Sequence, residues 1–239
     1  MVYLPHGKEA HRPQDSLRDH GFQSTPKGGG LLQSEDVYLR ACGRDELRVG
    51  LRMNIVEKMA RLAMIAHNGV NRKGPGNVPY IVHPHAVAAL LKEWGYTEQD
   101  DALTLAVAWG HDILEDTDMP ESEILAVDDL LGPRVLAGIK MLTFKPGVPS
   151  GHPDYGRLKA DYIANVARTT PPEIVVVKIA DRLCNTLDFF DDGESEHARA
   201  YLGYGEPLKS RIKDCKQSHA IMESWNDVRR LFDEGEWNG

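Results

Sequence analysis

The most constraining feature of the sequence is an apolar run over residues 102–109 that leads directly into the polar stretch Gly-His-Asp-Ile-Leu-Glu-Asp-Thr at 110–117. Side chains four positions apart share one face of a helix, so a helix here carries two polar pairs, His111 with Glu115 and Asp112 with Asp116. An adjacent imidazole and carboxylate can bind one divalent cation, and this mixed donor set suits Mn, Fe, Co or Zn better than Ca. The stretch predicts a buried helix that ends in a metal-binding or catalytic cluster.

Length and composition favour one globular domain. The chain has 239 residues, with 41% hydrophobic and 27% charged side chains, which is typical of a water-soluble fold with a proper core. No apolar run approaches the ~20 residues that a membrane helix needs, and the N-terminus lacks the pattern of a secretory signal. We therefore expect a cytoplasmic protein that does not enter a membrane.

Charge and cysteine content exclude several classes of function. The formal net charge of −8 disfavours general binding to nucleic-acid phosphates, which relies on clustered Lys and Arg. A small anionic ligand remains compatible with it, because a local basic patch and a metal ion can override the mean charge. The three cysteines, Cys42, Cys184 and Cys215, are far apart in the sequence. They argue against a disulfide framework or a thiolate zinc site.

Helix signals recur from residue 54 onward. Asn54 and Glu57 form a capping pair that opens a helix reaching about residue 67, with Gly69 behind it. Pro84 suits a first helical position, which places His83 at the N-cap of a helix over 84–94 that Gly95 ends. Thr97 and Asp100 are expected to open the next helix, which continues into the polar stretch. Gly110 costs about 1 kcal/mol of helix propensity relative to Ala, which suggests that another backbone comes close there.

The remaining patterns complete an all-α prediction. Helices are expected over 120–130, 133–142 and 157–168, with a Pro/Gly loop over 144–156 and one long or two short amphipathic helices over 206–232. Residues 1–50 show no sustained period and are expected to form a flexible N-terminal arm. Residues 51–239 would form one helical bundle, with the motifs within 54–190 and C-terminal helices over 194–235.

Residues 171–190 contain a conflict between two patterns. Their run of β-branched residues is typical of a buried strand. However, Thr170 and Glu173 form a capping box, and about 20 residues follow without a helix breaker, which is far longer than a usual strand. The sequence thus favours a buried helix. Four polar residues share one face of it and need partners in a core: Lys178, Asp181, Arg182 and Asn185.

Candidate metal ligands come from three elements. His83 precedes one predicted helix, His111 and Asp112 lie on another, and Asp181 lies on a third. Two imidazoles and two carboxylates would leave coordination positions open for water and substrate, as a catalytic metal requires. Glu115 and Asp116, one turn beyond the ligands, would lie near that water.

These residues resemble the H…HD…D signature of the HD superfamily of metal-dependent phosphohydrolases. Four longer blocks, in this order and spacing, are similar to the hydrolase domain of RelA/SpoT-type alarmone enzymes. They are Ala66-His67 with Arg72-Lys73, then Pro79 to Pro84 with Val87-Ala88, then His111 to Thr117, and finally Lys178 to Asn185. The resemblance covers about residues 54–190.

The resemblance implies an activity and a role for each candidate residue. It implies an all-helical HD domain that binds one Mn²⁺ and removes the 3′-pyrophosphate of ppGpp or pppGpp, giving GDP or GTP and pyrophosphate. It implies metal ligation by His83, His111, Asp112 and Asp181. It further implies that Glu115 and Asp116 position and deprotonate the attacking water, that Arg72 and Lys73 contact the base, and that Asn185 contacts the ribose. Tyr201 and Arg199 would supply late contacts to phosphate or base.

The chain also departs from the family pattern. Cys184 stands where many members have His. Ile163 and Ala164 stand where bifunctional members carry basic residues, in the helix before the Asp181 helix. About 50 residues follow the last block, so we expect a stand-alone hydrolase without a synthetase or regulatory domain.

Several alternatives stay open at the level of sequence. The HD site could act on another nucleotide, such as an adenine alarmone, a dNTP or a nucleoside monophosphate. The chain could also be a nucleotide sensor whose N-terminal arm engages a protein, although a sensor does not need an activated water. His67 is as compatible with core packing as with a substrate contact, and His152 could touch a pyrophosphate. The small-molecule nucleotide is the expected partner, and a homo-oligomer is left open.

Overall fold

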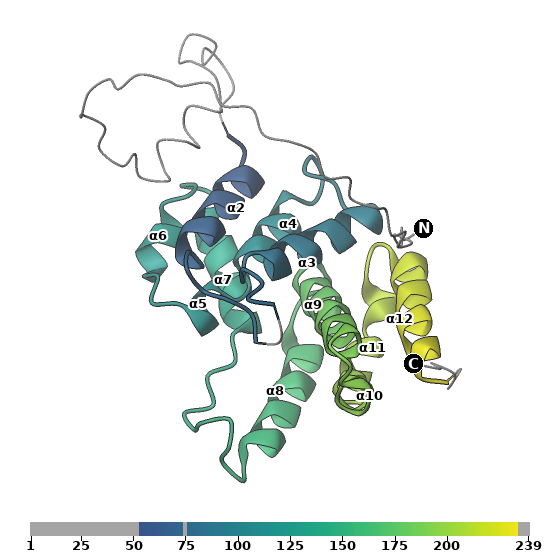
Figure 1. Cartoon of the computed structure of the whole chain (residues 1–239). Coiled ribbons are helices and arrows are strands. Elements are labelled where there is room, and N and C mark those ends of the chain that lie inside the picture. The colour runs from purple at the N-terminus through teal and green to yellow at the C-terminus, as the bar shows by residue number, and fades with distance from the viewer. Residues whose placement is uncertain (1–52, 74–75, 234–239) are drawn as a thin grey trace, which may run out of the picture. The chain divides into compact units, whose positions relative to one another are not determined.

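The computed structural model describes residues 53–73 and 76–233, and all of its regular elements there are helices (Figure 1). The β-pairing described in these ranges is one isolated bridge between Asn71 and Pro79. The all-α prediction is therefore confirmed. The expected flexible arm over residues 1–50 and the domain boundary that follows it lie outside the described residues.

The first two helices carry the predicted end signals. Helix α2 (Ile55–Ala66) begins after Asn54, whose side chain forms the predicted capping box with Glu57, and Gly69 follows with φ +75°. Helix α3 (Val82–Glu93) is followed by Gly95 with φ +92°. The N-cap prediction for His83 was wrong, since α3 begins two residues earlier than predicted and Ile81 is its N-cap. His83 lies within the first turn.

The polar stretch does not lie on one continuous helix, which corrects the prediction. Helix α4 (Ala102–Gly110) ends just before His111, and a separate short helix α5 (Ile113–Asp116) begins after Asp112. Thr97 does not open α4 either. Its hydroxyl accepts from the Asp100 amide in a preceding turn, and Asp101 is the residue before the helix.

The middle of the chain follows the predicted order with changed limits. Helix α6 (Glu121–Leu125) is much shorter than predicted, because a turn region separates it from α7 (Gly132–Leu142). Helix α8 (Tyr155–Thr169) follows the Pro/Gly loop. Helix α9 (Pro172–Asp191) confirms the choice of helix over strand, since it contains the whole β-branched run. The capping box predicted for Thr170 and Glu173 was wrong, because Pro171 is the N-cap and Thr170 ends α8.

The C-terminal region is more divided than predicted. It contains α10 (Ser195–Gly203), α11 (Glu206–Lys209), a 3-10 turn η2 (Ile212–Asp214) and α12 (Ser218–Asp233). Trp225 on α12 is fully buried. None of the helices in the described part of the chain is both long enough and apolar enough to cross a membrane.

Helix α4 is central to the bundle, since it packs against α2, α3, α7 and α9 (Figure 1). Its apolar run is completely buried from Leu105 to Ala108. The close approach expected at Gly110 involves side chains rather than another backbone. A Cβ there would lie 2.6 Å from Met59 Cε and 2.7 Å from Ile139 Cδ1. The packing of α2 and α7 on α4 therefore fixes the place where the polar stretch begins.

Candidate metal centre and its cleft

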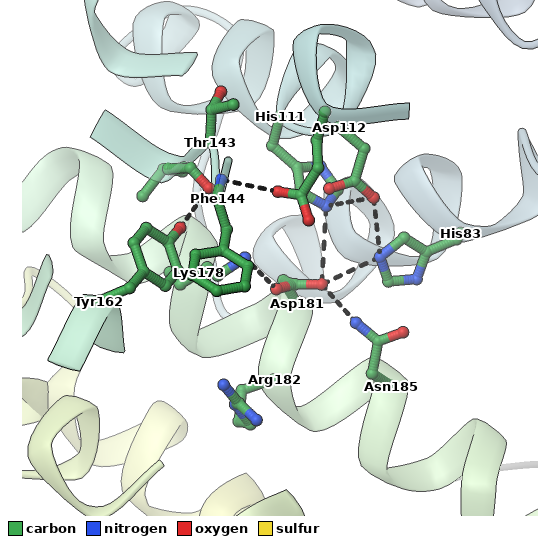
Figure 2. Close-up of polar contacts among 12 residues, drawn as sticks. His83, His111, Asp112, Thr143, Phe144, Tyr162, Lys178, Asp181, Arg182 and Asn185 are labelled. Atoms are coloured by element: carbon green, nitrogen blue, oxygen red, sulfur yellow. Dashed lines mark hydrogen bonds and ion pairs between the residues drawn. The ribbon is translucent and has the colours of Figure 1, made fainter. Parts of the chain in front are cut away.

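Helices α3 and α9 and the junction between α4 and α5 bring the predicted metal ligands together, as Figure 2 shows. One donor atom from each of His83, His111 and Asp112 lies within 4.8 Å of the others, and all three side chains are buried. Asp181 approaches from α9, with its Oδ1 3.0 Å from His83 Nε2 and 3.6 Å from His111 Nε2. The His-His-Asp cluster could hold a metal ion, and Asp181 is placed to add a second carboxylate oxygen.

The hydrogen bonding of His111 fits a metal ligand. Its Nδ1 lies 2.7 Å from the carbonyl oxygen of Ala108, and a carbonyl only accepts, so Nδ1 carries the proton. The other ring nitrogen, Nε2, is buried without a hydrogen-bond partner and faces Asp112 Oδ2 at 3.2 Å. An imidazole held through one nitrogen and free at the other is the usual state of a metal-binding histidine.

Neighbouring charges shift the pKa values of His111 and Asp112 in opposite directions. Burial alone lowers the pKa of His111, but the carboxylates of Asp112 and Asp181 raise it to about 10. Burial also opposes the charge of Asp112, yet His111 and then His83 hold the pKa of that carboxyl below its usual range. Positive charge is therefore favourable among these four side chains, and a divalent cation would supply it.

Asp181 is oriented by a buried lysine. Its Oδ2 lies 2.9 Å from Lys178 Nζ, and its Oδ1 faces the two imidazoles (Figure 2). Burial disfavours both charges, but Lys178 holds the pKa of Asp181 well below its usual value and Asp181 raises that of Lys178. On the polar face predicted for this helix, Lys178 thus finds a partner in Asp181, and the same carboxylate faces the two imidazoles.

Glu115 and Asp116 occupy different environments beside the cluster. Glu115 is half-buried, and its Oε2 accepts a hydrogen bond of 2.9 Å from the backbone amide of Phe144. Burial raises the pKa of Glu115, which suits a carboxylate that takes a proton near neutral pH. Asp116 is exposed, and its Oδ2 accepts from the hydroxyl of Tyr80. Both carboxylates line the cleft described next.

A cleft of about 390 Å³ opens beside the cluster. Asp112 and Asp181 reach it from the metal side, and its remaining walls come from residues 70–73, Tyr80, Phe144, α5, α8, α9 and α10. A cleft of this size matches the lower range of small-molecule sites. The metal centre is thus open toward a space that a nucleotide could enter.

The predicted substrate residues all line this cleft: Arg72, Lys73, Asn185 and Tyr201. Asn185 Oδ1 accepts from Arg72 Nη2 at 2.8 Å, and its amide nitrogen lies 2.5 Å from Asp181 Oδ1. Asn185 therefore connects the metal cluster to the cleft mouth.

Two residues that were expected to contact the substrate, Arg199 and His152, do not line the cleft. Arg199 donates to the carbonyl of Phe232 and lies over that ring instead. His152 is exposed beside Asp154 and is absent from the cleft wall. His67 is buried and stacks on Tyr80 with ring centres 4.6 Å apart, so it packs behind the cleft wall.

Sequence reasoning missed the basic inner wall of the cleft. Lys159 on α8 is half-buried, with Nζ 5.4 Å from the centre of the Tyr201 ring. Arg182 is 1% exposed and stacks on the same ring at 3.8 Å, and its Nε and Nη2 have no hydrogen-bond partner. Burial and then the charges of Arg182 and Lys178 lower the pKa of Lys159. Lys159 stands one turn before Ile163 on the same helix face, and that spacing was the signal that could have found it.

The chain is similar in sequence to several known proteins. No protein-family model matches the chain. A protein of Mycobacterium leprae named as a probable GTP pyrophosphokinase is 31% identical over 163 residues, which cover 67% of this chain and 19% of that protein. A protein of Synechocystis named as a probable guanosine-3′,5′-bis(diphosphate) 3′-pyrophosphohydrolase is 32% identical over 140 residues, or 56% of this chain and 17% of that protein. The chain thus spans less than a fifth of the length of these relatives.

A shorter relative matches over most of its own length. The Danio rerio protein named guanosine-3′,5′-bis(diphosphate) 3′-pyrophosphohydrolase MESH1 is 29% identical over 168 residues, which cover 70% of this chain and 86% of that protein. The solved structure described as a metazoan ortholog of SpoT that hydrolyzes ppGpp superimposes with a TM-score of 0.60 at 20% identity. It covers 77% of this chain and 98% of the other, which establishes a common fold.

Proposed function

We propose that this chain, which is an HD-type domain resembling the RelA/SpoT hydrolases, hydrolyses the 3′-pyrophosphate of ppGpp or pppGpp in a metal-dependent reaction. The products would be GDP or GTP and pyrophosphate. One observation carries the proposal, namely that His83, His111, Asp112 and Asp181 meet at the wall of a cleft lined by basic side chains. The names of the relatives support the choice of substrate.

The four side chains would hold one divalent cation, and we propose Mn²⁺. Two imidazole nitrogens and two carboxylate oxygens form a mixed donor set that suits Mn²⁺ and excludes a hard, all-oxygen calcium site. When bound, such an ion supplies Lewis acidity toward water and phosphoryl oxygens. Lys178 keeps Asp181 ionised and fixes its orientation, so the ligand set is prepared for the ion.

Two carboxylates would handle the attacking water. The amide of Phe144 occupies Oε2 of Glu115, which leaves Oε1 to take the proton from water. Asp116, held by the Tyr80 hydroxyl, would orient that water. The water oxygen bonds to the phosphorus next to the ribose, the bond from that phosphorus to the 3′ oxygen breaks, and the 3′ oxygen takes a proton as pyrophosphate leaves.

Binding of the nucleotide would be divided between two ends of the cleft. At its mouth, Arg72 is held by Asn185 and by Asp188, so its planar guanidinium is positioned to stack on a base. At its inner wall, Lys159 and Arg182 offer positive charge to phosphate groups. The whole chain has a net charge of −8, but these basic side chains lie together in the cleft. Such a local positive charge suits a small, highly anionic ligand.

The test is release of pyrophosphate from ppGpp by the purified full-length protein with Mn²⁺. We expect equal amounts of GDP and pyrophosphate, and no turnover after chelation. Asp112→Ala should reduce kcat more than ~100-fold, because loss of a ligand is more severe than loss of a group behind a ligand. Asp129→Ala, at an exposed position away from the cleft, is the matched control and should retain activity.

The same assay includes the alternative substrates. An adenine alarmone, a dNTP and a nucleoside monophosphate should be hydrolysed more slowly than ppGpp. If metal-loaded protein releases no pyrophosphate from ppGpp, the proposed function is wrong. A clear preference for a nucleotide without a 3′-pyrophosphate would show that the protein is an HD phosphohydrolase with a different substrate.

A further inference from the structure

Tyr80 is fixed in place by the loop and helix around it. Its amide donates to the carbonyl of Val70 at 2.8 Å, within the short pairing between Asn71 and Pro79. Its ring stacks on the buried His67 with planes 16° apart, and the guanidinium of Arg72 lies 5.6 Å from the ring centre. The hydroxyl therefore has little freedom to choose other partners.

That hydroxyl touches two carboxylates with different proposed tasks. It lies 2.8 Å from Oδ2 of Asp112 and also makes a hydrogen bond with Oδ2 of Asp116. A tyrosine hydroxyl carries one proton, so it can donate to only one of two ionised acceptors at a time. Burial and then the two carboxylates raise the pKa of Tyr80. The geometry thus contains a choice between two partners.

A metal ion at the cluster would compete for one of these partners. Oδ2 of Asp112 is the atom that lies 3.2 Å from His111 Nε2 and 3.6 Å from His83 Nε2. It therefore points to the place where the imidazoles converge. A cation held there would use this oxygen, which then becomes a poorer acceptor for the hydroxyl. Asp116 has no such competitor.

We propose that Tyr80 is a positioning residue whose hydroxyl is shared between Asp112 and Asp116 in the metal-free protein and donates to Asp116 alone once a divalent cation is bound. The hydrogen bond to Asp116 then orients that carboxylate for the attacking water, so occupancy of the metal site and alignment of the water-handling group are coupled. The inference deepens the proposed function and rests on it for the role of Asp116.

Tyr80→Phe is a narrow test of this role. It removes the hydroxyl and keeps the ring that stacks on His67 and lies near Arg72. Two measurements are needed: the affinity for Mn²⁺ by isothermal titration calorimetry without nucleotide, and steady-state kinetics with ppGpp. We expect Mn²⁺ to bind as tightly as in the natural protein or more tightly, since a competitor for Asp112 is gone. We expect kcat to fall about tenfold with KM unchanged, because a hydrogen bond to a charged group is lost.

Two results would overturn the inference. If the Mn²⁺ affinity of Tyr80→Phe falls about 10- to 100-fold, the hydroxyl supports Asp112 as a ligand, as groups behind metal ligands usually do. If kcat is unchanged, the hydroxyl does not act through Asp116.

Tyr96→Phe is the matched control. It also removes a tyrosine hydroxyl, but from a buried ring that is 4% exposed and lies outside the cleft wall, whereas Tyr80 is half-buried and lines the cleft. It should leave both the Mn²⁺ affinity and kcat unchanged. Circular dichroism melting curves of both variants report whether they fold.

The two arms separate this inference from the proposed function. The affinity for Mn²⁺ is measured without substrate, so it stands whichever nucleotide is cleaved. If the natural protein does not hydrolyse ppGpp, the proposed function is wrong. The kcat of Tyr80→Phe is then measured with whichever of the alternative nucleotides the natural protein hydrolyses.

Discussion

Both oxygens of the Asp181 carboxylate have partners. One oxygen faces the imidazoles of His83 and His111, and the other pairs with Lys178, which is buried on the same helix. A buried charge without a partner costs several kcal/mol, so neither Lys178 nor Asp181 would be tolerated here alone. The lysine balances the carboxylate, and the remaining oxygen stays directed at the candidate metal position.

Lys159 should contribute to substrate binding more than to chemistry. It is half-buried and lies near other cations, and burial followed by Arg182 and Lys178 lowers its pKa. An anion in the cleft would relieve that repulsion. Lys159→Ala should raise KM for ppGpp by about tenfold with little change in kcat. The variant loses a charge-assisted contact that stabilises the bound substrate and the transition state equally. Steady-state kinetics checks this.

Lys140→Ala is the control for that variant. Lys140 is exposed and pairs with Glu121 at 2.7 Å, away from the cleft wall. The KM of Lys140→Ala for ppGpp should therefore equal that of the natural protein. A large fall in kcat for Lys159→Ala with unchanged KM would contradict a binding role.

At the scale of elements, the break between α4 and α5 creates the site. The imidazole of His111 bonds to the carbonyl of Ala108 in the last turn of α4. The carbonyl of Asp112 accepts from the amides of Glu115 and Asp116, which begins the next turn. A continuous helix would keep these side chains at helical spacing along one axis. The break allows His111 and Asp112 to face α3 and α9 together.

The end of α4 depends on the absence of a side chain at Gly110. A Cβ there would come within 2.7 Å of Met59 and Ile139. Overpacking of a core costs about 1–3 kcal/mol, whereas Ala gains about 1 kcal/mol of helix propensity over Gly. We expect Gly110→Ala to lower the free energy of unfolding by roughly 1 kcal/mol and to weaken Mn²⁺ binding, since His111 follows directly. Urea denaturation and calorimetry measure the two effects.

Gly151→Ala provides the comparison for that variant. An added Cβ at Gly151 would meet nothing within 4 Å, so the free energy of unfolding should stay within about 0.5 kcal/mol of that of the natural protein. If Gly110→Ala is as stable as Gly151→Ala and binds Mn²⁺ normally, the packing of α2 and α7 does not set the position of His111.

At the scale of the whole molecule, the metal site joins distant parts of the chain. Its candidate ligands come from α3, the α4–α5 junction and α9, and these helices form much of the core. A ligand that binds only the folded state stabilises it, by about 2.7 kcal/mol when present at 100 times its Kd. For a protein of this size, that corresponds to a rise in Tm of roughly 5–10 °C.

Metal removal should therefore lower the thermal stability of the whole domain. We expect the Tm measured by circular dichroism to fall by several degrees when EDTA replaces Mn²⁺, because binding free energy is lost from the folded state. Asp112→Ala should show no such difference between the two conditions. Equal melting curves of the natural protein with Mn²⁺ and with EDTA would speak against a metal site in the core.

Local patterns were sufficient for much of the fold. The capping box at Asn54, the glycines after α2 and α3, and the unbroken run after Thr170 are signals within a few residues, and the structure confirms the helices that they predicted. Where a helix ended for tertiary reasons, the prediction failed. The short α6 is one example, because no Gly or Pro follows Leu125 directly. The break at His111 is another, because Gly110 alone did not show that the chain leaves the helix there.

The sequence alone determined the all-α class and the identity of the residues proposed as ligands, since both depend on residue type, order and spacing. The roles of these residues remain predictions. Only the tertiary structure decided which side chains meet. In the folded chain, His111 and Asp112 lie between two helices rather than on one continuous helix. Lys159 and Arg182 line the cleft. The Tyr80 hydroxyl lies between Asp112 and Asp116. The physical reason is that these meetings depend on how helix faces pack across the core, and packing joins residues that share no local pattern in the chain.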